Sequence, residues 1–257
     1  MRLLAVAQMT LVELWRQRTQ WGFILLAVLL ALPAVIPLDG MKINGSPAHG
    51  RALAEAWLSF AQFIAIFLAI SAAAGLVAHD LDRGTGLLLL SKPLRRWQIL
   101  LGKWLGAAAF MAVAWLVWGL IAAAAFAYRL DDALFGPAMA AFAASMVASW
   151  LIVAFCLFWS CWLPSNAVMG LSVVGWILAT SAPQVAGFVD DLGHKTLARV
   201  LRGVGEGLPF DKLSSAARSF VSGDDLDIKI LWSVGFIAAW WCAAAVVFAR
   251  RDLAAGS

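Results

Sequence analysis

Residues 104–128 read WLGAAAFMAVAWLVWGLIAAAAFAY, a stretch without a single Asp, Glu, Lys or Arg. Crossing the hydrocarbon core of a bilayer, about 30 Å thick, takes around 20 helical residues. A strand of a membrane barrel would be about half as long and would alternate polar with apolar residues. The stretch therefore predicts a helix that spans a membrane.

Five further runs of 18 to 27 residues show the same lack of charge, at residues 21–38, 56–78, 137–163, 167–189 and 230–249. The whole chain is 63% hydrophobic and 13% charged, with a mean hydropathy of +0.86. Its charges gather between the runs, because a charge at bilayer depth costs several kcal/mol. We therefore expect an all-α polytopic membrane protein with six transmembrane helices, forming a single domain over residues 1–257.

Basic residues indicate the orientation of these spans, since cytoplasmic loops carry an excess of Lys and Arg. With both termini in the cytoplasm, the cytoplasmic side holds Arg2, Arg16, Arg18, Arg83, Lys92, Arg95, Arg96, Lys103, Arg250 and Arg251. The two short outside loops hold only Lys42, Arg51 and Arg129. The long outside segment 190–229, between the last two spans, is an exception because it contains six basic residues.

Two segments outside the spans show helical amphipathic spacing. Before the first span, within residues 1–19, the apolar stripe consists of Leu4, Ala7, Leu11 and Leu14. We expect this segment to form an interfacial helix. In the segment 190–229, apolar residues recur at helical spacing until Pro209, and a second short stretch follows at 213–221. We expect these stretches to lie on or dip into the outer leaflet, with a solvated loop as the alternative.

The runs contain essentially no ionisable residue, whereas ion-coupled carriers and proton pumps usually place such groups within the membrane. The phosphate-binding pattern GxxxxGK[ST] is also absent, so the chain is not expected to hydrolyse ATP itself. No catalytic constellation, metal site or cofactor site is expected. Nor is a nucleic-acid surface, because no basic stripe is interleaved with aromatic residues.

Gly102 and Gly106 stand four residues apart where the third span begins. Small residues at this spacing allow helices to approach closely. Packing within the chain is the favoured interpretation, with a seam between two copies as the alternative.

The segment 79–103 between the second and third spans is physically unusual; up to Gly106 the sequence reads HDLDRGTGLLLLSKPLRRWQILLGKWLG. It places four consecutive leucines between a glycine-rich break and a basic pair. Four exposed leucines need to be covered by a membrane or by a partner's surface. Ser91 and Pro93 have the residue types that begin a helix, which we expect to run on into the third span.

This pattern resembles the cytoplasmic loop of bacterial ABC-2 type exporter permeases, which carry acidic residues, Gly-Thr, leucines, Pro, a basic residue and Gly-Lys. The resemblance implies that the segment is the element that couples the permease to its ATPase. The residues that it assigns to this contact are Asp80, Asp82, Gly84, Thr85, Leu87, Leu88, Leu89, Leu90, Lys92, Pro93, Arg95 and Arg96. The family more often has glutamates where this chain has Asp80 and Asp82.

The resemblance also implies partners: two copies of a cytoplasmic ABC ATPase, which bind ATP and magnesium, and a second copy of the permease or a related one. The chain would lie in the bacterial inner membrane, in contact with lipids and with a possible extracytoplasmic protein partner. The compact layout is similar to permeases of sodium export, bacteriocin immunity and nitrous oxide reductase maturation.

The expected function is therefore that of a permease that exports a lipid-like or amphipathic substrate, or transmits a mechanical signal across the membrane. A membrane scaffold that recruits soluble proteins without transport is the alternative. A secondary carrier is disfavoured because the runs lack a coupling-ion site.

Overall fold

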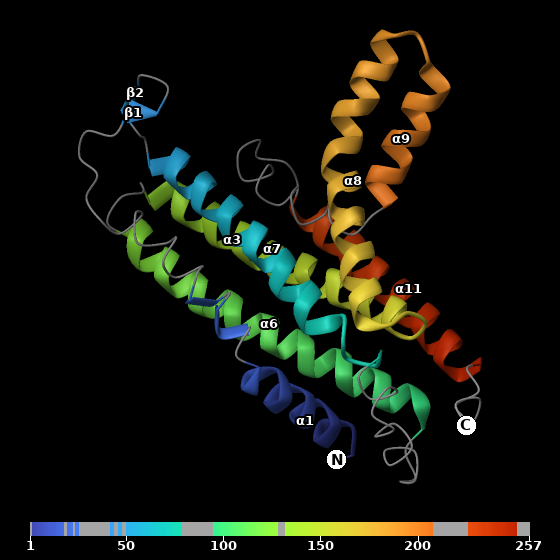
Figure 1. Cartoon of the computed structure of the whole chain (residues 1–257). Helices are drawn as coiled ribbons and strands as arrows, with labels where there is room; N and C mark the ends of the chain where they lie inside the picture. Colours follow the sequence, from blue (N-terminus) through green and yellow to red (C-terminus); the bar gives the residue numbers. More distant parts are fainter. Residues whose placement is uncertain are drawn as a thin grey trace.

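The protein is helical throughout almost all of its described length (Figure 1). The computed structural model describes residues 2–17, 20–22, 24–25, 42–43, 46–47, 50–78, 95–127, 132–207 and 226–250. Its elements are α1 (Arg2–Arg16), β1 (Lys42–Ile43), β2 (Ser46–Pro47), α3 (Gly50–Ala73), α6 (Arg96–Ala127), α7 (Asp132–Ser160), α8 (Ser165–Asp191), α9 (Lys195–Gly207) and α11 (Leu226–Arg250). The two strands form a short antiparallel ribbon.

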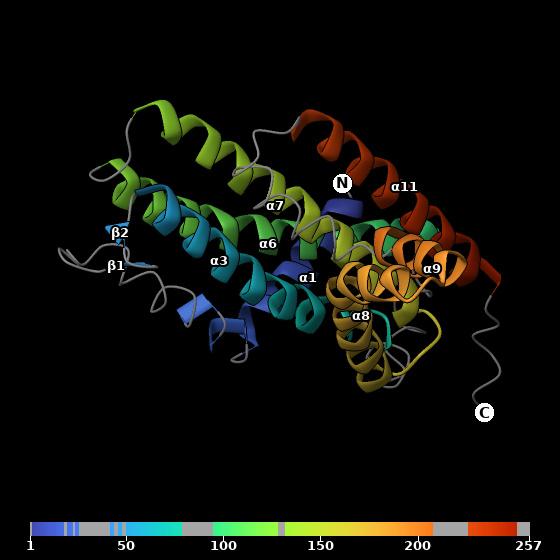
Figure 2. The same ribbon diagram turned by 90° about the horizontal axis from the view of Figure 1, so that it is seen from above.

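Helices α3, α6, α7 and α11 pack along one another, with α7 between α3 and α11 (Figures 1 and 2). Buried polar contacts join them. The Gln62 amide of α3 donates to the Ser145 hydroxyl of α7 at 2.8 Å, and the Trp115 indole of α6 donates to Ser149 at 3.1 Å. Hydrogen bonds of this kind help helices to associate where lipid and side chains are equally apolar.

Helix α1 packs lengthwise on the beginning of α6. Val6 contacts Gly102, and Thr10 contacts Gly106 one turn later. The two helices therefore run in the same direction over this stretch. A Cβ atom at Gly102 would lie 2.7 Å from the Val6 Cβ, and one at Gly106 would lie 2.6 Å from the Ala7 carbonyl oxygen. The prediction that these glycines serve packing within the chain is confirmed.

The expected apolar stripe of α1 is wrong in one respect. Leu4 is 67% exposed, whereas Val6, Thr10 and Leu14 are buried against the bundle. The reason is that α1 is apolar on more than one side. The side that packs on α6 is the one that carries Val6 and Thr10, which contact the two glycines. Met9 and Val12 of α1 are exposed as well, whereas Leu11 of the expected stripe packs against the core.

Helices α8 and α9 form a hairpin that stands away from the bundle (Figure 1). The turn between them requires Gly193, whose φ of +86° favours a residue without a Cβ atom. An ion pair of 2.9 Å joins Asp190 to Arg202 across the hairpin, and both side chains are substantially exposed. The expected helix after the fifth span is confirmed in α9, and the stretch 213–221 lies outside the described residues.

Within the described residues, α6, α7 and α8 are long and apolar enough to cross a membrane, and α3 and α11 contain shorter apolar segments. The run 21–38 lies mostly outside the described residues, so the count of six spans stays a prediction. Helix α6 begins at Arg96, inside the segment 79–103. Helix α8 extends to Asp191 and α11 begins at Leu226, so both ends of the segment 190–229 are helical. Nothing in the composition marks these ends, because helices continue past their apolar runs.

Replacing Gly106 by alanine is expected to destabilise the protein, because the new methyl group would clash with the Ala7 carbonyl oxygen. Overpacking of this kind costs about 1–3 kcal/mol, more than alanine gains in helix propensity. The matched control is Gly170→Ala on α8, where nothing lies within 4 Å of the new Cβ atom. Thermal unfolding in detergent should show a lower midpoint for Gly106→Ala only; equal midpoints would contradict the close contact.

Candidate functional site

The candidate site is the end of the bundle that carries the predicted coupling segment. Of the twelve predicted coupling residues, only Arg95 and Arg96 lie within the described residues. Those outside are Asp80, Asp82, Gly84, Thr85, Leu87, Leu88, Leu89, Leu90, Lys92 and Pro93. The structure therefore describes the two points where the segment leaves α3 and enters α6.

The chain leaves α3 through a turn at residues 74–77 that neighbouring helices hold in place. The buried Ser160 hydroxyl, at the end of α7, accepts the backbone N–H groups of Val77 and Ala78, each at 3.2 Å. The ammonium group of Lys103 on α6 donates to the carbonyl oxygen of Leu76. A buried ammonium needs such a partner, because its charge is costly to remove from water.

The N-terminus of α6 is capped by a side chain and hydrogen-bonded to α11. The Gln98 side chain accepts the backbone N–H of Arg95 at 3.0 Å, which is one half of a capping box. The guanidinium group of Arg96 donates to the Phe248 carbonyl oxygen at 3.3 Å, in the last turn of α11. A cation at a helix C-terminus is favoured by the helix dipole.

The start of α6 differs from the expectation that a helix beginning at Ser91 and Pro93 runs on into the third span. Ser91 and Pro93 lie outside the described residues, and Arg95 is not helical, so α6 begins at Arg96. The capping residue is Gln98, inside the first turn, instead of a serine before it.

Both ends of the segment are thus attached to helices of the bundle. The exit from α3 is bound to α6 and α7, and the start of α6 is bound to α11. Figure 1 shows the ends of α3 and α11, the start of α6 and helix α1 gathered at one end of the molecule. A displacement of the segment would act on these helices directly, because hydrogen bonds to backbone groups restrict how far the bonded parts can move apart.

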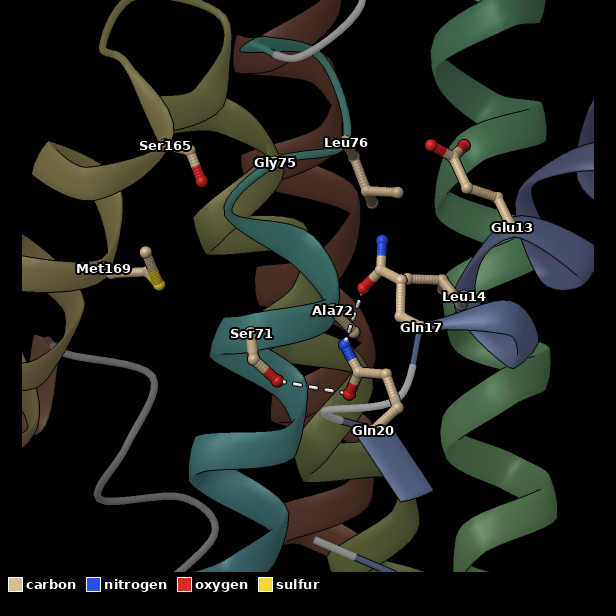
Figure 3. Close-up of a pocket in the computed structure, with 10 residues that line it drawn as sticks. All are labelled: Glu13, Leu14, Gln17, Gln20, Ser71, Ala72, Gly75, Leu76, Ser165 and Met169. Atoms are coloured by element: carbon tan, nitrogen blue, oxygen red, sulfur yellow. Dashed lines mark hydrogen bonds between the residues drawn. The ribbon is translucent and has the colours of Figure 1, made fainter. Parts of the chain in front are cut away.

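A polar pocket of roughly 290 Å³ adjoins these anchors, between the end of α1, the end of α3 and the start of α8 (Figure 3). Its wall contains a chain of hydrogen bonds. The Gln20 amide donates to the Gln17 side-chain oxygen at 3.2 Å, and the Ser71 hydroxyl lies 3.2 Å from the Gln20 oxygen. Gln20 is only 1% exposed, and Gln17 and Ser71 are partly buried.

Exposed tryptophans gather at this end, as expected for side chains that lie at a membrane interface. They are Trp15, Trp21, Trp97 and Trp162, each more than 40% exposed. The Trp21 indole donates to the Trp15 carbonyl oxygen at 2.8 Å, and the two rings meet edge to face at 4.6 Å. Tryptophan favours the interfacial layer, where an apolar ring and a polar N–H are both accommodated.

Sequence reasoning missed the residues that anchor the segment. Lys103 was noted only as a basic residue and as part of a Gly-Lys pair, and Ser160 and Gln98 were not singled out. One signal was present, since a lysine between Gly102 and Trp104 at the edge of an apolar run needs a partner. Within the described residues, no three His, Cys, Asp or Glu side chains gather as metal ligands.

A family model described as ABC-2 family transporter protein matches residues 4–192. The match extends from α1 to the end of α8 and includes the whole coupling segment. A search of curated proteins finds no match to the chain.

Replacing Ser160 by alanine is expected to destabilise the exit from α3, because two buried N–H groups lose their acceptor. An unsatisfied buried donor costs about 1–3 kcal/mol. Hydrogen exchange at Val77 and Ala78 should accelerate, and the midpoint of thermal unfolding should fall. Thr180→Ala is the control, since that exposed hydroxyl binds only carbonyl groups of its own helix. Unchanged exchange in Ser160→Ala would contradict the anchor.

Proposed function

Because the chain belongs to the ABC-2 family of transporter proteins, we propose that it couples ATP hydrolysis by a separate subunit to movement across the membrane. Family membership makes it a multi-pass membrane permease, a transport component that is normally not catalytic. Such permeases work in general with an ABC ATPase and as dimers. The finer proposal concerns how force reaches the spans.

One observation carries this proposal: both ends of the coupling segment are hydrogen-bonded to helices of the bundle. Four consecutive leucines, residues 87–90, provide an apolar surface that fits a groove on an ATPase subunit. When ATP closes the ATPase pair, the segment moves with it. The Lys103 and Ser160 contacts then carry this movement to α6 and α7, and the Arg96 contact carries it to α11.

The substrate of the proposed transport is lipid-like or amphipathic. The apolar runs contain essentially no ionisable residue, whereas ion pathways through a membrane usually carry such residues. Mechanical signalling to an extracytoplasmic protein is the other action that the same movement supports. We place the protein in the bacterial inner membrane with both termini in the cytoplasm, following the distribution of its basic residues.

Affinity purification of the tagged protein in mild detergent should recover a P-loop ATPase at near equal stoichiometry. Leu88→Asp and Arg95→Glu are expected to reduce this recovery at least tenfold, because they place the wrong charge on the docking surface. The conservative variants Leu88→Met and Arg95→Lys should retain it. Mass spectrometry of the eluate provides the measurement. Recovery of other soluble proteins without any ATPase would favour a scaffold instead.

Lys103→Met is expected to leave ATPase binding intact and to lower permease-dependent stimulation of ATP hydrolysis severalfold. The substitution preserves the length of the side chain but removes the donor to Leu76. Arg199→Met on α9 is the control, because it removes an exposed positive charge far along the chain from the segment. Full stimulation in folded Lys103→Met protein would exclude this route of force transmission.

A further inference from the structure

We propose that the polar pocket between α1, α3 and α8 binds the zwitterionic headgroup of an aminophospholipid, such as phosphatidylethanolamine. This inference concerns a site outside the coupling segment. It is independent of the proposed coupling, because lipid binding is measured without an ATPase.

Figure 3 shows Glu13 and Ser165 on opposite sides of the pocket. On one side, Glu13 of α1 contributes a carboxylate. On the other side, Ser165 contributes a hydroxyl at the first residue of α8, where no side chain caps the helix. A helix N-terminus favours a negative group, and a carboxylate favours a positive one. An ammonium group directed at Glu13 and a phosphate directed at Ser165 would match both walls.

Hydrogen bonds among Gln17, Gln20 and Ser71 orient the polar side chains that line one part of the pocket. Since the Gln17 oxygen accepts from Gln20, the Gln17 amide nitrogen is directed into the space between Leu76 and Glu13, as Figure 3 shows. It is a donor suited to a phosphate or ester oxygen. The chain fixes this amide in one orientation, so the donor is held in place before a ligand binds.

The charge of the pocket distinguishes among lipids. Among its described lining residues, Glu13 is the one ionisable group, and none is basic. An anionic headgroup without an amine, such as that of phosphatidylglycerol, would face Glu13 with no cation among these described lining residues. A trimethylated amine, as in phosphatidylcholine, has no N–H group and therefore cannot donate a hydrogen bond to the carboxylate.

The position and size of the pocket favour a lipid over a free solute. The exposed Trp15 and Trp21 flank the α1 side of the pocket in sequence and mark the interfacial layer, where headgroups lie. Leu76 and Met169 add apolar surface on the α3 and α8 walls. A volume of roughly 290 Å³ is at the lower limit of small-molecule sites, which suits a headgroup but not a whole lipid.

The test reconstitutes the purified full chain into nanodiscs containing equal amounts of phosphatidylethanolamine, phosphatidylcholine and phosphatidylglycerol. Lipids that remain bound after re-extraction into detergent are then quantified by mass spectrometry. The wild-type protein should retain phosphatidylethanolamine in excess of both other lipids. Glu13→Gln should reduce this excess about two- to fivefold, as expected for one partly solvated ion pair. Ser165→Ala should reduce it as well.

Asp191→Asn is the matched control, because Asp191 is an exposed acid at the opposite end of α8. It should leave the excess unchanged, and thermal unfolding verifies that each variant is folded. Three results would overturn the proposal: no excess in the wild type, an excess of phosphatidylglycerol, or the same excess in Glu13→Gln as in the wild type. Displacement of the lipid by soluble phosphoethanolamine as effectively as by short-chain phosphatidylethanolamine would assign the pocket to a soluble ligand instead.

Discussion

The thickness of the hydrocarbon core is the constraint on which this structure depends. Helix α6 has 32 residues and is therefore about 48 Å long, well beyond the roughly 30 Å of the core. Its first turns have to be covered by protein or by the interfacial layer. Helix α1 provides that cover, and it can approach so closely only because Gly102 and Gly106 have no side chains. The rest of the coupling end is built around this covered start of α6.

Polar groups concentrate at the same end for a related reason. Where α3 ends, backbone N–H and C=O groups lose their helical partners, and in an apolar setting each needs a substitute. Ser160 and Lys103 supply these substitutes from two different helices. The bonds that satisfy the turn are the bonds that connect the coupling segment to α6 and α7. In the proposed mechanism, the residues that satisfy the backbone are therefore also the residues that would transmit force.

The polar pocket follows from the same crowding of helix ends. The end of α1, the end of α3 and the start of α8 meet at this pocket, and each contributes polar groups that would not be tolerated deep in a membrane. The chain from Ser71 through Gln20 to Gln17 joins α3 to the segment that follows α1. Ligand binding in this pocket would therefore bear on the positions of α1 and α3, and both of these helices contact α6.

The sequence by itself determined the helical class, the approximate extent of the runs that became α3, α6, α7, α8 and α11, and the packing role of Gly102 and Gly106. It could do so because length, charge exclusion and small-residue spacing are local properties of a chain in lipid. Only the tertiary structure decided which side of α1 is buried, where α6 begins, and which residues anchor the coupling segment. Those outcomes depend on contacts between residues far apart in sequence, such as Lys103 with Leu76 and Arg96 with Phe248. No local pattern encodes such contacts, because each partner is a backbone carbonyl group, which every residue carries.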